Sequence, residues 1–479
     1  MADVVLINSP IILYQDAEDK NSFRWHGGDE RSVYPLGVLY IAAYLEQKGH
    51  SVRVIDMAPE GKTLLDIYDI LKTEKPYVVG ISSLTTSIQS AVSLASAIKQ
   101  KFGDAIHVGL GGVHLCVDPT FVDRFPVFDF GVIGDGEKTL EQILVQVKRG
   151  EKVRGIFHGE TIKNLDELPF PARHLIDPKI YLREEQLKFE VSMAGVLGSR
   201  GCPYQCCFCC IPSIAGKVRM RSAKNIVDEM EAVYDQCRGN YNFIDDCLTL
   251  SKKHTLAFCQ EIIDRRLKVR WLASTRANTI DDEVAKALKR AGCADIYFGV
   301  ESGNERVRNE VIKKKVTDKD IAKAVYHCRK QGILTNLFLM VGFPGETKKE
   351  MMDTVKIGNR VKADIVGIHL TIPFPGSEIY KHCIEKNILP KDIIDQYALG
   401  KLGRGFRDVW PLFIPEGSSI EELITIKKKV YTSFYLNPFW MLRRMRTWFV
   451  IPGKFREDLK LFKIALYVFK TGGTKGQLS

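Results

Sequence analysis

The chain lacks the features that mark membrane-spanning and secreted proteins. No uninterrupted apolar run among its 479 residues reaches the length that a bilayer-spanning helix needs. The run from Met1 to Ile7 has no basic segment ahead of its apolar residues, so we expect no secretory signal. The 12 cysteines are spread along the chain, unlike those of small disulfide-rich domains. These absences favour a cytoplasmic protein with reduced thiols.

A basic surface distributed over the whole chain is also absent. The formal net charge is +11, but residues 440–479 hold nine Lys or Arg against two acidic residues. The basic character therefore belongs to a C-terminal tail, and we expect no nucleic acid as a partner. The hydrophobic content of 45% and the charged content of 27% are ordinary for a globular protein, and the length predicts two or three domains.

Three cysteines in one short run carry the most specific signal. Cys202, Cys206 and Cys209 are spaced Cys-x3-Cys-x2-Cys, with Phe208 directly before the last of them. Three thiolates on one loop are able to hold three irons of a 4Fe–4S cluster and to leave the fourth iron open, whereas electron-transfer clusters use four cysteines. An open iron indicates chemistry at the metal.

Other interpretations of this run fit less well. A structural zinc site needs four closed ligands, and no second Cys-x2-Cys or His pair follows at a suitable spacing. Cys207 and Cys210 offer a competing register, Cys-x4-Cys-x2-Cys, that also begins at Cys202. We favour the first register because Phe208 then stands directly before the last ligand.

The run resembles the signature of the radical S-adenosylmethionine (SAM) superfamily. In that family SAM chelates the open iron, and reduction of the cluster cleaves SAM to a 5′-deoxyadenosyl radical. By position, the resemblance implies that Cys202, Cys206 and Cys209 are the cluster ligands and that Phe208 packs near the adenine.

Residues 1–150 alternate short apolar strands with helical patterns. This alternation predicts a doubly wound, Rossmann-like domain with a parallel sheet, which binds ligands at the carboxyl ends of its strands. Small residues stand at those ends, in the runs 82–86, 111–114 and 134–137. Taken alone, such runs are also ordinary turn chemistry.

Together these runs resemble the cobalamin-binding domain, in which a Ser-x-Leu element precedes a Gly-Gly pair. Here 26 residues separate Leu84 from Gly111. The resemblance implies that the cobalamin contacts come from the three runs. The residues concerned are Ser82, Leu84, Thr85, Gly111, Gly112, Gly134 and Glu137.

One element of that family, Asp-x-His-x2-Gly, is missing from the chain. In the family this element supplies a histidine to the cobalt. Either the cobalt has no protein histidine below it, or the domain is a relic that no longer binds cobalamin. We favour cobalamin binding and interpret His50 and His114 as surface or loop histidines.

Residues 151–192 are expected to be a linker, because Pro169 and Pro171 disfavour helix there. From residue 193 to 390 the pattern becomes six strand–helix pairs, which predicts a partial (β/α)6 barrel with its chemistry at the carboxyl ends of the strands. The expected strands are 194–198, 241–245, 270–275, 295–300, 335–341 and 365–372, and one expected helix covers 225–236.

Charged residues follow three of these strands. Asp245 and Asp246 are ordinary helix caps or, by resemblance, contacts of the SAM amino group. Arg276 is either a solvated strand end or a forked donor that suits a carboxylate. Glu301, with Ser302 beside it, matches the family position that accepts the ribose hydroxyls. The runs 342–346 and 373–377 resemble family signatures that shape the SAM pocket.

Residues 391–479 predict a helical C-terminal segment rich in aromatic and basic side chains. One interpretation is a helical cap over the mouth of the barrel. The other is an interfacial helix that brings the protein to a membrane, which would suit a lipid-like substrate. Residues 384–420 are expected to form a loop along the path of substrate access, and Arg219 and Arg221 to cap a loop.

The resemblance implies a cobalamin-dependent radical SAM enzyme with a 4Fe–4S cluster, SAM and cobalamin as cofactors. In methylating members the radical removes a hydrogen from an unactivated carbon, methylcobalamin delivers a methyl group, and a second SAM restores the methylcobalamin. We favour methylation of a secondary metabolite or lipid-like substrate, with an external flavodoxin- or ferredoxin-type electron donor. The alternatives are cyclisation, ring rearrangement or oxidation, a radical SAM enzyme without cobalamin, and a non-enzymatic iron–sulfur or cobalamin sensor.

Overall fold

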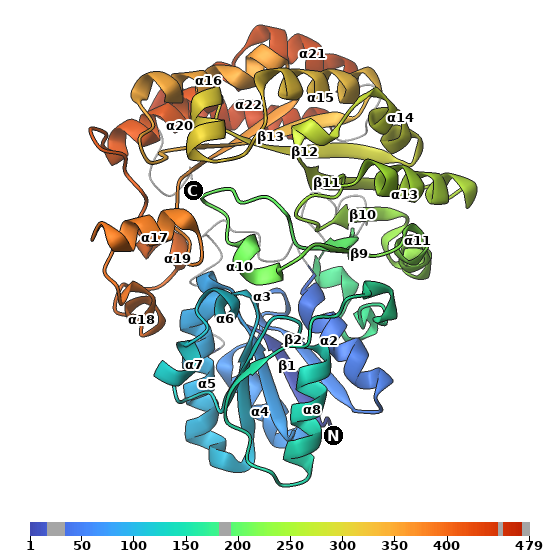
Figure 1. Ribbon diagram of the computed structural model, residues 1–479, viewed down its shortest axis with the longest axis vertical. Coiled ribbons are helices and arrows are strands. Elements are labelled where there is room, and N and C mark those ends of the chain that lie inside the picture. The colour runs from blue at the N-terminus through green and yellow to red at the C-terminus, as the bar shows by residue number, and fades with distance from the viewer. Residues whose placement is uncertain (17–33, 182–192, 449–453, 472–479) are drawn as a thin grey trace.

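Two parallel sheets, one in each half of the chain, form the framework of the protein (Figure 1). The structure is a computed structural model that describes residues 1–16, 34–181, 193–448 and 454–471. The N-terminal sheet lies at one end of the molecule and the second sheet at the other, with the carboxyl-end loops of both between them. The α/β class, with a Rossmann-like domain followed by a partial barrel, is confirmed.

The N-terminal sheet has six parallel strands in the order β2-β1-β3-β4-β5-β6. Its central strands are apolar almost without a break, because helices cover both faces. The strands are β1 (Val4–Asn8), β2 (Val52–Asp56), β3 (Val78–Ser82), β4 (His107–Gly111), β5 (Phe130–Ile133) and β6 (Gly155–His158). The helices are α2 (Leu36–Gln47), α3 (Met57–Glu60), α4 (Leu64–Glu74), α5 (Ile88–Phe102), α6 (Val113–Val117), α7 (Phe121–Arg124) and α8 (Glu137–Lys148).

A buried carboxylate, Asp56, ends β2, the edge strand beside β1. Asp56 is 2% exposed, and its two oxygens accept hydrogen bonds from Asn8 Nδ2 at 2.9 Å and from the Tyr181 hydroxyl at 2.7 Å. Burial raises the pKa of Asp56 to about 6 in spite of these donors. Between about pH 4 and pH 6, Asp56 is therefore mostly protonated in the folded protein and mostly ionised in the unfolded chain.

This raised pKa predicts a pH dependence of stability. The favourable contribution of neutral Asp56 is fully present below about pH 4 and is lost as the pH rises through about 6. Asp56→Asn removes the titration, so the variant should gain stability relative to wild type between pH 4 and 7. A pKa shift of one unit corresponds to about 1.4 kcal/mol, so the gain should be on the order of 2–3 kcal/mol. Urea unfolding at several pH values measures it, and Asp104→Asn, at a side chain that is 92% exposed, is the control.

The second sheet has six parallel strands in the order β14-β13-β12-β11-β10-β7, with helices along its outer side (Figure 1). The strands are β7 (Ala194–Val196), β10 (Asn240–Phe243), β11 (Arg270–Thr275), β12 (Cys293–Glu301), β13 (Leu334–Val341) and β14 (Ile365–Leu370). The helices are α11 (Ala223–Ala232), α12 (Tyr234–Cys237), α13 (Lys252–Asp264), α14 (Asp282–Arg290), α15 (Asp318–Lys330) and α16 (Lys348–Val361). The helix expected over 225–236 is divided at Val233, and the domain boundaries at 150, 192 and 390 stay predictions.

A short hairpin of β8 (Ser199–Arg200) and β9 (Arg219–Met220) interrupts the barrel after its first strand. Residues 201–218 lie between its two strands and include α10 (Ile211–Ala215). Directly after the hairpin, Arg221 is 3% exposed and donates to the buried Glu229 of α11. Arg173 of the preceding linker donates to the other oxygen of Glu229 at 2.5 Å. Arg221 therefore belongs to a buried ion-pair network and does not only cap a loop.

The C-terminal segment divides into two parts. α17 (Glu378–Glu385), α18 (Ile393–Ala398) and α19 (Phe406–Val409) lie at one side of the molecule at the level between the two sheets, and α18 packs against α5. α20 (Ile420–Tyr435) packs against α16 and β14 on the outer side of the barrel, and α21 (Pro438–Trp448) and α22 (Lys454–Thr471) follow it there.

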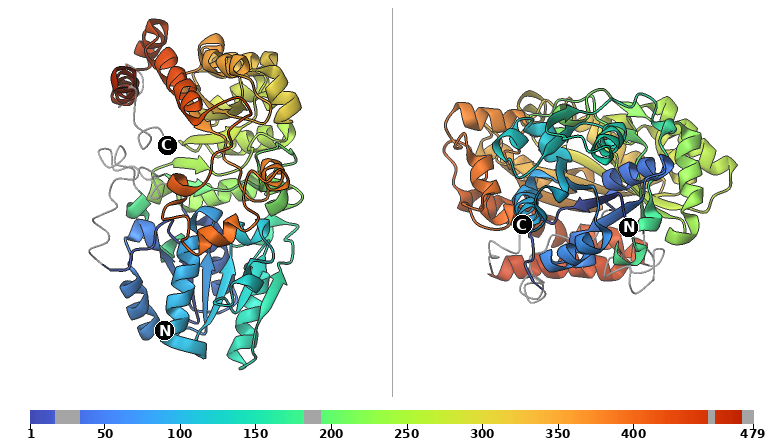
Figure 2. Two further views of the ribbon diagram at one scale, coloured as in Figure 1. Left: turned by 90° about the vertical axis from the view of Figure 1, so that its left-hand side faces the viewer. Right: turned by 90° about the horizontal axis from the view of Figure 1, so that it is seen from below.

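Figure 2 shows these last helices in red at the end of the molecule opposite the N-terminal sheet. The expectation of a helical cap over the barrel mouth is therefore wrong, because the apolar face of α20 is buried against the outer side of the sheet. The stretch 384–420, which the sequence predicted as a loop, contains α18 and α19. No helix in the described ranges is long and apolar enough to cross a bilayer.

Candidate active site

The three cysteines of the Cys-x3-Cys-x2-Cys run lie in the loop enclosed by the β8–β9 hairpin. Cys206 is 9% exposed, and Cys202 and Cys209 are partly exposed. Cys207 is 4% exposed, its N–H donates to the Ile312 carbonyl, and its carbonyl accepts from Ile379 N–H. Burial raises the pKa of both Cys207 and Cys209 to about 12, so the pKa does not separate the two registers. The backbone hydrogen bonds hold Cys207 in the apolar core, which favours the register of Cys202, Cys206 and Cys209.

Among the residues that the structure describes, no three His, Cys, Asp or Glu side chains converge as they would around a single metal ion. In a 4Fe–4S cluster each iron takes one thiolate, so its ligands stand farther apart than those of one zinc ion. Three cysteines on one loop fit such a cluster by their chemistry. Their role as its ligands stays a prediction.

The two carboxylates that follow β10 have different surroundings. Asp245 is 4% exposed and accepts hydrogen bonds from Gly198 N–H at 2.8 Å and from the Ser199 hydroxyl at 2.6 Å. Burial raises the pKa of Asp245 to about 6. Asp246 instead lies near Cys202 and Cys209 and lines a cavity. Asp246 is thus the better placed of the two to bind a ligand.

Arg276, at the end of β11, links several groups around the cysteine loop. Its Nη1 lies 3.8 Å from Cys206 Sγ, and its guanidinium carbon lies 3.5 Å from the centroid of the Tyr204 ring. Its Nη2 donates to the Lys314 carbonyl. The Lys314 ammonium in turn donates to Glu301 Oε1 at 2.9 Å. Arg276 and Glu301 therefore lie in one buried network with the second cysteine.

Sequence reasoning missed Lys314, which is 5% exposed. Lys313 and Lys315 on either side have positive φ angles of 63° and 54°, and this backbone geometry goes with a buried Lys314 between them. Glu301 itself has a φ of 64°, a left-handed conformation that costs about 1–3 kcal/mol and is common at functional sites. Nothing in a run of three lysines indicates which of them is buried.

The two remaining barrel candidates have different surroundings. The Phe208 ring centroid lies 6.1 Å from that of Phe343, which belongs to the loop after β13. The predicted adenine contact thus adjoins a run that was expected to shape the SAM pocket. Ser302 is fully buried, and its hydroxyl lies near Thr354 Oγ1 and accepts from Asn304 N–H at 3.2 Å. Its hydrogen bonds indicate a structural role.

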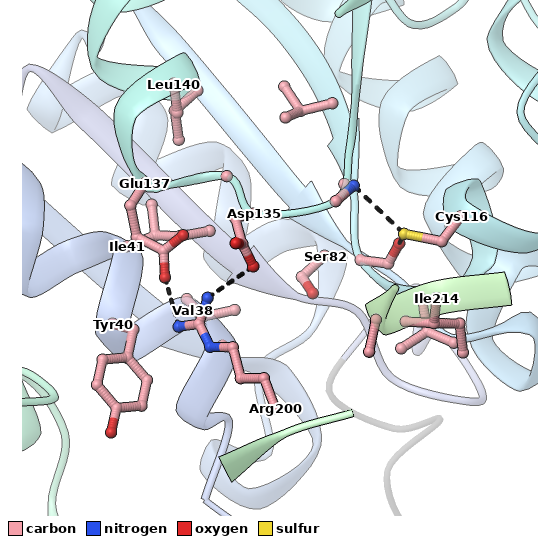
Figure 3. A pocket seen from close by; sticks show the side chains of 18 of the residues that line it. Val38, Tyr40, Ile41, Ser82, Cys116, Asp135, Glu137, Leu140, Arg200 and Ile214 are labelled. Carbon is pink, nitrogen blue, oxygen red and sulfur yellow. Dashed lines mark hydrogen bonds and ion pairs between the residues drawn. The ribbon is translucent and has the colours of Figure 1, made fainter. Parts of the chain in front are cut away.

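A cavity of about 400 Å³ lies where the carboxyl ends of the two sheets meet (Figure 3). Residues from the ends of β3, β4 and β5 line one side, and Ser199, Ile244 and Asp246 of the barrel line the other. The cavity brings together most of the residues predicted to contact cobalamin: Ser82, Gly111, Gly112, Gly134 and Glu137. Leu84 and Thr85 are not in its lining.

Leu84 and Thr85 lie on the loop beyond the cavity edge. Leu84 is 53% exposed, and Thr85 Oγ1 lies 3.1 Å from Nδ1 of His114. His114 is fully buried in α6 rather than at the surface, so that interpretation of it was wrong. Burial lowers the pKa of His114 to about 4, which keeps its imidazole neutral. The His50 side chain is only 10% exposed and lies 3.7 Å from Glu141.

The lining of the cavity is made largely of small and apolar residues. Gly112 has a φ of 94°, and a Cβ there would lie 2.7 Å from the backbone of Ser83, so only glycine suits this close turn. A Cβ on Gly109 would lie 2.3 Å from the Phe130 ring. Val38 and Ile41 of α2 add apolar walls. A mostly apolar lining with a few charged groups is typical of a cofactor-binding cavity.

Four further residues at this site were not among the predicted contacts. Arg200, Arg219 and Asp135 form ion pairs at the edge of the cavity. Cys116 also lines it, and Cys116 Sγ accepts from Gly134 N–H at 3.4 Å. Asp135 had a signal in the sequence, since it stands inside the small-residue run after β5. Arg219 was expected only to cap a loop, whereas it binds Asp135 and the Ile162 carbonyl.

The comparisons with known proteins agree with this geometry. A family model described as the radical SAM superfamily matches residues 196–357, and one described as the B12 binding domain matches residues 30–144. An uncharacterized methyltransferase of Pyrococcus horikoshii is 30% identical over 89% of this chain and 94% of its own length.

Two further relatives are more distant. An anaerobic magnesium-protoporphyrin IX monomethyl ester cyclase of Rubrivivax gelatinosus is 25% identical over 84% of this chain and 74% of that protein. A solved structure of the methyltransferase TsrM from Kitasatospora setae, with cobalamin and a 4Fe–4S cluster bound, has the same fold. Its TM-score is 0.62 at 21% identity, over 81% of this chain and 78% of that chain.

Proposed function

Because this chain belongs to the cobalamin-dependent radical SAM enzymes, we propose that it transfers a methyl group to an unactivated carbon of a small-molecule or lipid-like substrate. The cofactors of this family are a 4Fe–4S cluster, SAM and cobalamin. When bound, the reduced cluster supplies the electron that splits SAM, and cobalamin supplies the methyl group.

Different residues of the barrel are suited to hold the cluster and SAM. Cys202, Cys206 and Cys209 would bind three irons of the cluster. Asp246 offers a carboxylate beside two of these cysteines, which suits the SAM amino group. Glu301 suits the ribose hydroxyls, and its Oε1 accepts a hydrogen bond from the Lys314 ammonium at 2.9 Å. Each of these acidic groups stands at a strand end, where such barrels bind their ligands.

A single observation carries the proposal: the strand ends of both sheets line one cavity. A methyl donor held by Ser82 and Gly112 on one side would face ligands held near Asp246 on the other. Apolar walls of this kind would limit the access of water to the space between them, which would protect reactive species from solvent. A cobalamin-binding domain that was only a relic would not need this shared lining.

The test uses the full chain with its cluster reconstituted under anaerobic conditions. Hydroxocobalamin is added first, and bound corrinoid is measured from its visible spectrum. The loaded protein then receives SAM with a deuterated methyl group, a chemical reductant, and a fractionated extract of small molecules and lipids. We expect 5′-deoxyadenosine and S-adenosylhomocysteine to form together and a deuterated methyl group to appear in one fraction. SAM cleavage without corrinoid binding would contradict the proposal.

A cyclisation without methyl transfer is the second candidate, because the cyclase of Rubrivivax gelatinosus aligns with 84% of this chain. The same assay separates the two. A cyclase would form 5′-deoxyadenosine without S-adenosylhomocysteine, since no methyl group leaves SAM. An external donor of the flavodoxin or ferredoxin type would replace the chemical reductant in the cell.

We further propose a cytoplasmic location with peripheral membrane contact through α21 and α22. Phe439 and Leu442 of α21 are 70% and 63% exposed and stand one helical turn apart. On α22 the exposed Phe455 and Phe469 stand on a helix that also exposes Arg456 and Lys463. Aromatic and basic side chains on one helix favour binding to an anionic lipid surface.

Removing two of these apolar side chains should weaken membrane binding. The variant Phe439→Ser/Leu442→Ser should bind vesicles of phosphatidylcholine and phosphatidylserine at least about tenfold more weakly than wild type, since each side chain contributes on the order of 1 kcal/mol. Co-sedimentation measures the bound fraction. Leu399→Ser is the control, because this side chain is 55% exposed and stands at the end of α18, outside α21 and α22. Equal binding by wild type and the double variant would refute the membrane contact.

A further inference from the structure

Two arginines of the barrel half, Arg200 and Arg219, bind carboxylates that follow β5, and Figure 3 shows the contacts of Arg200. Arg200 donates to Asp135 Oδ1 at 2.8 Å and to Glu137 Oε1 at 2.6 Å, so one guanidinium holds two carboxylates. Arg219 donates to the other oxygen of Asp135 and to the Ile162 carbonyl. The four charged side chains are at most 15% exposed, so salt screens them weakly.

Both arginines belong to the hairpin that encloses the cysteine loop. Arg200 of β8 is paired with Arg219 of β9, and residues 201–218 lie between them. Cys202 follows Arg200 by two residues. A guanidinium is a planar fork that fixes the direction of two carboxylate contacts, whereas a lysine ammonium on its flexible stem does not. The base of the cysteine loop is therefore held by carboxylates from the N-terminal half.

One oxygen of this ion-pair cluster has a free acceptor position. Glu137 is 2% exposed and lines the cavity. Its Oε1 binds Arg200, whereas its Oε2 is buried and accepts no hydrogen bond from the described residues. A buried acceptor of this kind is costly unless a ligand supplies a donor. A corrinoid carries primary amide groups around its ring, and their N–H groups are such donors.

We propose that Arg200 is a positioning residue that couples the corrinoid site to the cluster site. A corrinoid amide bound at Glu137 Oε2 fixes this carboxylate, the carboxylate fixes Arg200, and Arg200 fixes the base of the loop that carries the cluster. This inference rests on the proposed cobalamin and SAM binding. Because coupling between two binding sites is reciprocal, cobalamin raises the affinity for SAM by the same factor as SAM raises the affinity for cobalamin.

The experiment measures that factor on the full chain with its cluster reconstituted and no reductant, so that SAM stays intact. The Kd of hydroxocobalamin is taken from visible spectra with and without saturating SAM. The Kd of SAM is taken by calorimetry with and without hydroxocobalamin. In wild type each ligand should tighten the other about fivefold or more. Arg200→Lys should bring the factor close to one while iron content is kept and both ligands still bind.

Two further variants separate the role of Arg200 from a general effect of substitution on folding. Glu137→Gln keeps the shape of the side chain but removes the charge that holds Arg200, so it should lower the factor as well. Arg124→Lys is the matched control, because Arg124 bridges Asp118 at 2.6 Å and Asp395 of α18 at 3.0 Å, away from the cavity. This arginine also joins the N-terminal half to a later part of the chain.

The possible outcomes distinguish the coupling role of Arg200 from the cobalamin binding on which that role depends. Equal losses of coupling in Arg124→Lys and Arg200→Lys would mean that general docking of the two halves carries the effect, and this would overturn the role of Arg200. A factor near one in wild type, with both ligands bound, would overturn it too. Failure of wild type to bind hydroxocobalamin would overturn the proposed cobalamin function, and the inference with it.

Discussion

Replacing Cys206 with alanine will lower the iron content of the reconstituted protein and reduce SAM cleavage more than about 100-fold. Loss of outer-shell partners of a metal already costs 10–100-fold, and Cys206 is predicted to bind iron directly. The thiol lies 3.8 Å from Arg276, inside the network that ends at Glu301. Iron analysis and the release of 5′-deoxyadenosine under reducing conditions measure the two effects.

The neighbouring residue provides the matched control. Cys207→Ala removes one sulfur atom from the apolar core, where Cys207 is held by backbone hydrogen bonds to Ile312 and Ile379. We expect this variant to keep its iron and its activity, with a small loss of stability. The reverse pattern, in which Cys207→Ala loses the cluster and Cys206→Ala keeps it, would establish the competing register.

Replacing Glu229 with alanine will destabilise the fold by about 3–5 kcal/mol, the range measured when one partner of a buried ion pair is removed. Glu229 is fully buried, and its two oxygens neutralise Arg173 and Arg221, which are 5% and 3% exposed. Alanine would leave two buried guanidinium groups without a counter-charge. Thermal and urea unfolding of the full chain measure the loss.

The same helix carries a surface control. Glu231 pairs with Arg265 at 2.6 Å, but its side chain is 43% exposed, so Glu231→Ala should cost less than about 1 kcal/mol. A similar loss for both variants would show that the buried network contributes no more than a surface pair. Glu229→Gln should fall between the two, because its amide oxygen keeps one of the two hydrogen bonds, whereas its NH2 group cannot accept the other and the charge is lost.

The strands and the main motif were accessible from the sequence because each depends on local pattern. The strand Arg270–Thr275 has the bounds that its apolar run predicts. The spacing of Cys202, Cys206 and Cys209 is a property of one short loop. The glycine Gly112 marks a turn whose φ of 94° excludes other residues, and such positions are readable one residue at a time.

Residues whose role depends on distant partners were not accessible in this way. Asp245 and Asp246 are adjacent in the sequence. Only the fold shows that Ser199 donates a hydrogen bond to Asp245 and that Asp246 lines the cavity. Lys314 becomes part of the site through backbone geometry on both sides of it. Arg200 meets Glu137 across 63 residues of sequence, a separation that no local pattern encodes.

The apolar side of the N-terminal sheet that carries α5 and α7 is completed late in the chain. Phe121 and Phe128 share one core cluster with Tyr397, Phe406 and Trp410. During synthesis at about 5–20 residues per second, that side would leave the ribosome on the order of 15–50 s before the segment that covers it. The nascent chain thus exposes this apolar surface for most of its translation. We therefore expect the supply of chaperones during expression to limit the yield of folded protein.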